Sequence, residues 1–151
     1  MSETSSQGSL EAPEVRLAAA AVAGDGAEVA LLLDAGVPVD ARDAGGYTAL
    51  MHAAYARQPD TVELLLDRGA DVNARALTDE TPLIGAALGR SLDVVRMLLD
   101  RGADINATDA SGTSALQAIL QQKPADEDPD AVVEYCEVVD LLQAAHVGIC
   151  I

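Results

Sequence analysis

The segment LLLDRGADVNA at residues 64–74 recurs almost unchanged 33 residues later, as MLLDRGADINA at residues 97–107. The two copies agree at nine of eleven positions, and a third copy, LLLDAGVPVDA, occupies residues 31–41. A second landmark repeats with the same step, since Leu17, Leu50, Leu83 and Leu116 each begin an alanine-rich or aliphatic stretch. Two landmarks with one period predict a repeat architecture, in which each unit stacks on its neighbours.

Each unit is predicted to be a turn followed by two helices. Thr48, Thr81 and Ser114 stand in register at the start of the first helix, where a side-chain hydroxyl can accept a hydrogen bond from a free backbone amide. The second helix carries Leu and Val at helical spacing. It ends at Gly36, Gly69 or Gly102, where glycine can adopt the left-handed conformation of a C-terminal cap. The fold class is therefore all-α.

The segments TALMHAA from Thr48 and TPLIGAA from Thr81, together with the LLLDRGADVNA type of segment, resemble the ankyrin repeat. The resemblance covers roughly residues 13–151 and implies a slightly curved solenoid with β-turn fingers and a concave face of inner helices. It also implies a non-enzymatic role in protein recognition. We expect a disordered tail over 1–9 and one domain over 10–151, with repeats at approximately 10–41, 42–74, 75–107 and 108–151.

Only the middle two repeats look regular. In the first, we expect the helix to begin early, with Pro13 in its first turn. In the third, Ala76 and Asp79 replace the residues equivalent to Asp43 and Gly46, so its finger, RALTDET, is predicted to differ in shape, through drift in a loop or through fit to a partner.

The fourth repeat contains an acidic insertion around QQKPADEDPD, residues 121–130. Leu141 and Leu142 follow Leu98 and Leu99 by 43 residues instead of 33, which predicts ten inserted residues. A final helix should start at Pro129 and end near Ala144, before His146. The acidic segment is either a solubilising cap or a contact for a basic partner.

Composition narrows the class of partner. With 25 acidic and 9 basic side chains, the chain carries a formal charge of −16, which repels nucleic acid phosphates and anionic lipid and favours basic partners. No signal peptide, apolar span of bilayer length or dense cysteine framework is present, so we expect a cytoplasmic monomer with no membrane contact.

The sequence offers no catalytic or metal-binding motif. It has no P-loop, no GxSxG and no HExxH, and its two histidines, His52 and His146, lie in different repeats. We expect His52 to be a packed, hydrogen-bonded side chain. No cofactor, metal or enzymatic activity is expected.

The resemblance implies that partner contacts come from the finger tips and the exposed ends of the inner helices. Two of the three tyrosines fall in this set, with Tyr47 either anchoring a partner or packing only against its own finger. Arg57, Arg90 and Lys123 recur after the inner helices, either to complement the helix dipole or to form a basic row. The predicted partner-binding residues are Tyr47, Tyr55, Leu77, Thr78, Glu80, Leu88, Ser111, Thr113, Gln121 and Gln122.

Two functions are compatible with these features. The first is a protein–protein interaction module that binds a partner through its concave face and fingers. The alternative is an acidic inhibitor or immunity-type protein that blocks a basic enzyme, and its binding should weaken strongly with salt.

Overall fold

The computed structural model describes residues 12–122 and 129–150. The predicted tail over 1–9 and the centre of the acidic insertion, around Asp126, lie outside these residues. Within them the chain forms four helix pairs and an isolated bridge between Thr108 and Ser114. The pairs are α2 (Pro13–Ala23) with α3 (Gly26–Asp34), α4 (Ala49–Tyr55) with α5 (Pro59–Asp67), α6 (Pro82–Leu88) with α7 (Leu92–Asp100), and α8 (Ala115–Leu120) with α9 (Pro129–Cys150).

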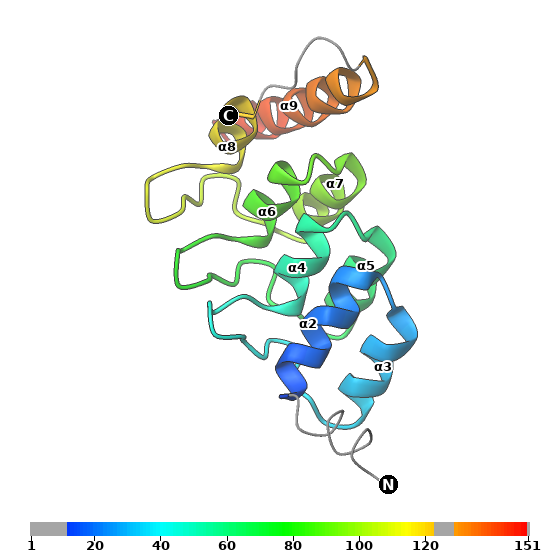
Figure 1. Ribbon diagram of the computed structural model, residues 1–151. Helices are drawn as coiled ribbons and strands as arrows, with labels where there is room; N and C mark the ends of the chain where they lie inside the picture. The colour runs from blue at the N-terminus through cyan, green and yellow to red at the C-terminus, as the bar shows by residue number, and fades with distance from the viewer. Residues whose placement is uncertain (1–11, 123–128, 151) are drawn as a thin grey trace, which may run out of the picture.

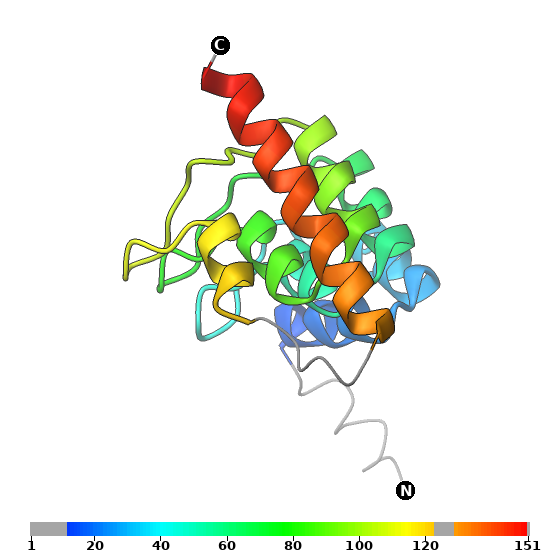
Figure 2. The same cartoon turned by 90° about the horizontal axis from the view of Figure 1, so that it is seen from above.

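The pairs stack in chain order as two layers (Figure 1). The inner layer is the row α2, α4, α6 and α8, and the outer layer is the row α3, α5, α7 and α9. The loops that precede α4, α6 and α8 project together to one side of the inner layer (Figures 1 and 2). The all-α repeat solenoid predicted from the sequence is therefore confirmed.

The inner helices start as the sequence predicts, and the first three outer helices, α3, α5 and α7, end as it predicts. The hydroxyls of Thr48, Thr81 and Ser114 accept hydrogen bonds from the amides of the third helical residues, and Ser114 forms a full capping box with Gln117. Gly36, Gly69 and Gly102 have φ values of 103°, 89° and 92°. Cβ atoms are disfavoured in this conformation, so glycine at these positions ends each outer helix at little cost.

The core is built from small and aliphatic side chains, as expected from the composition. Leu17, Leu50 and Leu83 are at most 1% exposed and occupy equivalent places in successive repeats. Their counterpart Leu116 is only half-buried, since no further repeat of the described residues stacks on that side. Alanines between them let adjacent inner helices approach closely.

Polar contacts with the period of the repeat reinforce the stack. Arg68 pairs with Asp34 over 2.9 Å, and Arg101 pairs with Asp67 over 2.7 Å, in the same relative position one repeat later. These pairs are exposed, so each contributes at most about 1 kcal/mol to the free energy of unfolding. They recur with the period of the repeat, but the buried apolar core supplies most of the stability.

The finger turn of the third repeat does not differ in backbone shape, so that prediction is wrong. Asp79 takes φ +61°, close to the +78° of Gly46, and its amide donates to Ala76 O over 2.9 Å as that of Gly46 does to Asp43 O. Aspartate is one of the few side chains that tolerate this left-handed region. The turn therefore keeps its backbone conformation despite the substitutions. It lacks only the carboxylate that, in the second repeat, accepts hydrogen bonds from the amides of Gly45 and Tyr47, since Ala76 replaces Asp43.

The last helix pair departs from the repeat. The final helix begins at Pro129 as predicted, but it continues to Cys150 instead of ending near Ala144, so His146 lies within it. The buried residues of this helix are Val138, Val139 and Leu142, and each lies 44 residues after its buried counterpart in α7, Val94, Val95 or Leu98. Since the repeat period is 33, the insertion is eleven residues long rather than the predicted ten. Figure 2 shows α9 crossing the end of the stack, where it packs on α7 and α8.

Candidate functional site

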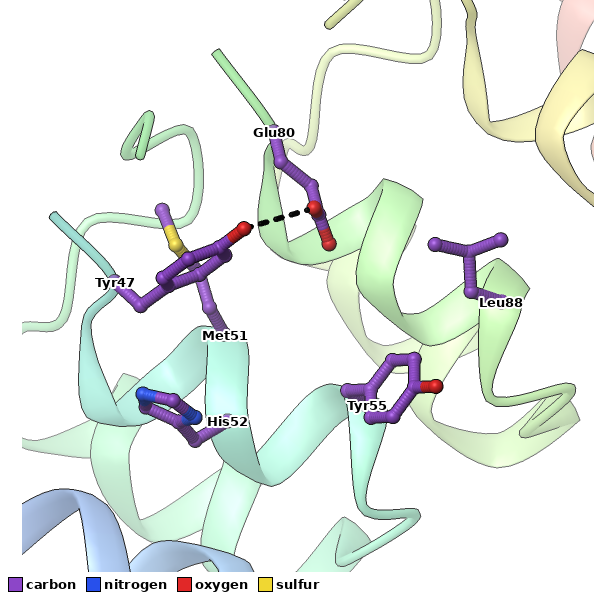
Figure 3. A pocket seen from close by; sticks show the side chains of 6 residues that line it. All are labelled: Tyr47, Met51, His52, Tyr55, Glu80 and Leu88. Atoms are coloured by element: carbon purple, nitrogen blue, oxygen red, sulfur yellow. Dashed lines mark hydrogen bonds between the residues drawn. The ribbon is translucent and has the colours of Figure 1, made fainter. Parts of the chain in front are cut away.

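A hollow of about 260 Å³ opens on the inner-helix face beside the fingers, between α4 of the second repeat and α6 of the third (Figure 3). We refer to it as the α4–α6 hollow. Four of the predicted partner-binding residues line it, together with two that were not predicted. The lining residues are Tyr47, Met51, His52, Tyr55, Glu80 and Leu88.

Tyr47 links the second repeat to the third. Its ring is partly buried against Met51, Ala74 and Ala76, and its hydroxyl donates to Glu80 Oε2 over 3.3 Å. Of the two alternatives for Tyr47, packing only against its own finger is therefore wrong. The side chain forms one wall of the hollow and holds the carboxylate of Glu80 in place.

His52 is hydrogen-bonded, as predicted, and it also faces the hollow. Its Nε2 lies 2.8 Å from Asp43 Oδ2, and since a carboxylate only accepts, Nε2 carries the proton. Burial raises the pKa of Asp43, but the hydrogen bonds from His52 and from the amides of Tyr47 and Gly45 outweigh it, so the pKa lies below its ordinary value. Asp43 therefore remains ionised and fixes the imidazole.

Glu80 is the acidic group inside the hollow. Burial raises its pKa above the ordinary value, the Tyr47 hydrogen bond and the nearby His52 oppose that rise, and repulsion from Asp109 adds to it. Neighbouring groups thus compensate the negative charge of this carboxylate only in part. Figure 3 shows it between Tyr47 on one side and Leu88 on the other.

Tyr55 and Leu88 form the other end of the hollow, and they occupy equivalent positions in successive repeats. Tyr55 is 60% exposed, so its ring offers apolar surface to a binding partner. Gly85 lies beneath, in the position that His52 has one repeat earlier. A Cβ there would lie 3.7 Å from Glu80 Oε1 and 3.9 Å from Tyr55 Cβ, so the absence of a side chain at Gly85 keeps the floor open.

A second, shallower hollow of about 490 Å³ lies between the third and fourth fingers. Thr78, Glu80 and Ser111, all predicted, line it with Asp109 and Ala110. The hydroxyl of Ser111 and the amide of Thr113 donate to Asp109 and lower its pKa. Glu80 belongs to both hollows, which makes it the common element of the surface.

Two family models match this chain: one described as ankyrin repeats (3 copies) matches residues 15–76, and one described as ankyrin repeats (many copies) matches residues 65–118. The chain belongs to the ankyrin repeat family. No curated protein matches it significantly. Ankyrin repeats are generally protein–protein interaction modules, and the family is typically non-enzymatic.

The remaining predicted ankyrin contact residues lie apart from the two hollows. Leu77 is 79% exposed at its finger tip, where its amide donates to Gly45 O over 3.1 Å. Gln121 and Gln122 are exposed where α8 ends, beyond both hollows, and Thr113 serves its own finger turn through Asp109. The predicted set is thus one cluster of six residues in repeats 2 to 4 with four outlying positions.

The basic residues that recur after the inner helices have two alternative predicted roles, complementing the helix dipole or forming a basic row. The first of them, Arg57, contacts another part of the fold. Arg57 and Arg90 have left-handed φ values of 62° and 56°, at the point where Gly24 has 72°. Arg57 pairs with Glu134 of α9 over 2.9 Å, which ties the last helix back to the second repeat. The side chain of Lys123 lies outside the described residues.

The described parts of the chain contain neither a metal-binding group of side chains nor a membrane-spanning helix. Among the side chains that the structure describes, those of residues 12–122, 129–130 and 132–144, His, Cys, Asp and Glu form no group of three or more that is arranged to hold a metal ion. Over residues 12–122 and 129–150 no helix has both the length and the apolar character needed to cross a bilayer.

Proposed function

We propose that this ankyrin repeat protein binds a folded protein partner through the fingers and inner-helix ends of its second and third repeats. The observation that carries the proposal is the α4–α6 hollow, where two repeats place the exposed Tyr55 and the partly buried Tyr47 and Leu88 around a carboxylate. Partner-binding surfaces characteristically combine such anchors with a polar rim.

Tyr55 has the character of a binding anchor. A tyrosine ring that is 60% exposed has much apolar surface to bury, and its hydroxyl can still meet a polar group. Leu88 stands beside it, half-buried, and extends the apolar contact. Truncation of an anchor of this kind characteristically weakens binding by about 2 kcal/mol or more.

A second function, inhibition of a basic enzyme, is favoured by charge. The chain carries −16, and Glu80, Asp109 and Asp43 lie on or beside the proposed surface. An inhibitor that relies on this charge should bind more weakly as salt rises, since mobile ions screen exposed charges over about 8–10 Å at physiological strength. Affinity that is constant between low and high salt would contradict the inhibitor function while leaving the interaction module intact.

The experiment that tests the proposal is capture of the partner from the native cell with the full chain, followed by hydrogen exchange on the purified complex. The partner should slow exchange at the fingers around residues 43–47 and 76–80 and at the ends of α4 and α6, where Tyr55 and Leu88 lie. The outer helices α3 and α5 are the internal control. Slowed exchange confined to α3 and α5 would place the partner on the opposite face and refute the proposal.

A further inference from the structure

The α4–α6 hollow has a chemistry more specific than a general contact surface. Its walls are the side chains of Tyr47, Met51, Tyr55 and Leu88, and its one unpaired charge is the carboxylate of Glu80. Glu80 Oε2 accepts a hydrogen bond from Tyr47, whereas Oε1 accepts none from the residues whose side chains the structure describes, 12–122, 129–130 and 132–144. The hollow therefore presents a free acceptor oxygen above an open floor.

Three carboxylates act on the hollow, Glu80 in its lining and Asp43 and Asp109 beside it. No lysine or arginine lines it, and its histidine, His52, is held by Asp43 over 2.8 Å. Asp109 raises the pKa of Glu80 by repulsion, as burial also does. A cation placed beside Glu80 would relieve both effects, whereas an anion would meet Glu80, Asp43 and the charge of the whole chain.

Resting on the proposed function, we propose that the α4–α6 hollow receives the charged end of one arginine or lysine side chain of the partner protein. The methylene stem of such a side chain packs along apolar walls while its head group meets a carboxylate. The rings of Tyr47 and Tyr55 add an attraction, since their faces are negative. At about 260 Å³ the hollow is smaller than the roughly 300–1,000 Å³ of small-molecule sites, so it suits a single side chain.

A neutral apolar side chain fits this site less well. Leucine would fill the volume, but it would remove water from Glu80 Oε1 and offer no donor in exchange. An ionised carboxylate that loses its water without gaining a partner is strongly unfavourable. A guanidinium or ammonium group supplies both donors and the compensating charge.

Short peptides test the inference without knowledge of the partner. The full chain, labelled with ¹⁵N, is titrated with acetyl-Gly-Arg-Gly-amide and with its lysine, citrulline and leucine analogues. Citrulline is the critical probe because it keeps the shape of arginine but is neutral. We expect saturable shifts of the amides around Tyr47, Tyr55 and Glu80 with the two cationic peptides, and at least threefold weaker binding of the two neutral ones.

Two variants separate a specific contact from the general negative field. Glu80→Gln retains an acceptor for Tyr47 and should weaken the arginine peptide about three- to fivefold, the range of partly exposed ion pairs. Glu63→Gln removes the same charge from the exposed face of α5 and should leave binding unchanged. Equal losses in the two variants, a leucine peptide that binds as tightly as arginine, or no shifts with any peptide would each overturn the inference.

Failure here is distinguishable from failure of the proposed function. If the hollow prefers leucine, Tyr55→Ala still weakens the captured partner, and only the nature of the inserted side chain is wrong. If Tyr55→Ala leaves the partner's affinity unchanged, the proposed function fails whatever the peptides show.

Discussion

Tyr47 and Glu80 occupy the same position of consecutive repeats, 33 residues apart, and the phenol of the first donates a hydrogen bond to the carboxylate of the second over 3.3 Å. One repeat position thus supplies an aromatic wall in the second repeat and an acidic group in the third. The bond crosses the boundary between repeats and shapes the α4–α6 hollow.

Removal of this bond should change the titration of Glu80. The Tyr47 hydroxyl lowers the pKa of Glu80 against the effect of burial, so Tyr47→Phe should raise that pKa further above its ordinary value of 4.5. The ring and its packing remain, so the free energy of unfolding should fall by no more than about 1.5 kcal/mol. Carbon-detected NMR titration of the Glu80 carboxyl measures the shift, and an unchanged pKa would mean that the bond does not form in solution.

Gly85 and Gly89 should respond in opposite directions to the same substitution. In Gly85→Ala the new Cβ finds its nearest atom, Met51 O, at 3.6 Å, an ordinary contact, and alanine favours the helix by about 1 kcal/mol. In Gly89→Ala the Cβ would lie 2.6 Å from Tyr55 O, so repeats 2 and 3 must separate, at a cost of roughly 1–3 kcal/mol.

Urea unfolding of the two glycine variants measures both effects. Gly85→Ala should be more stable than the wild type, yet it should bind the arginine peptide less tightly because its methyl group rises into the floor of the hollow. A variant that gains stability and keeps full binding would show that the floor is not used.

Asp79 tests the cost of the left-handed turn in the third finger. Its φ of +61° disfavours a Cβ. Asp79→Gly should therefore be the most stable of the three proteins, wild type intermediate and Asp79→Ala the least stable, over a span of about 1–2 kcal/mol in the free energy of unfolding. Thermal unfolding of the three proteins gives the order. An alanine variant as stable as the glycine variant would contradict the strain assigned to this turn.

The pair of Asp43 and His52 should make stability depend on pH. The pKa of Asp43 is lower in the folded chain than its ordinary value of 3.8, so the folded state binds this proton less tightly than the unfolded state does. The stabilisation is therefore fully present above pH of about 4 and is lost as pH falls through the folded pKa. Asp43→Asn should be less stable than the wild type at neutral pH, and the difference should shrink in acid.

Denaturation midpoints of wild type and Asp43→Asn across this range provide the comparison. Asp109→Asn is a useful second variant, since Asp109 caps the fourth finger in the same way but has no histidine partner in the described residues. A stability difference for Asp43→Asn that stays constant from neutral to acidic pH would contradict the linkage.

The sequence predicts the features that depend on neighbours along the chain. Thr48 and Gly69 act within one turn of a helix, so spacing alone identifies a cap, and the 33-residue period then places each helix that precedes the insertion. The turn at Asp79 was mispredicted because the period indicates which residue differs, but not that aspartate tolerates the same φ as glycine.

Features that depend on contacts between repeats were predicted less well. Met51 and His52 line the hollow because Gly85, one repeat later, leaves space above the next helix, and no local pattern in the sequence signals that relation. The Arg57–Glu134 pair joins residues 77 positions apart, so it depends on the path of α9 after the insertion. The sequence thus predicts the positions of the helices better than the directions of the side chains that meet across a repeat boundary.

The central claim is that the surface of the second and third repeats binds the partner, and the affinity of the captured partner for two matched variants tests it most directly. Tyr55 and Leu31 are 60% and 64% exposed, the first beside the hollow and the second on the outer helix α3. Truncation of either to alanine should leave the fold intact. We expect Tyr55→Ala to raise the Kd roughly 30-fold, in line with about 2 kcal/mol for an anchor, and Leu31→Ala to leave it unchanged. An unchanged Kd for Tyr55→Ala, or a loss confined to Leu31→Ala, would contradict the claim.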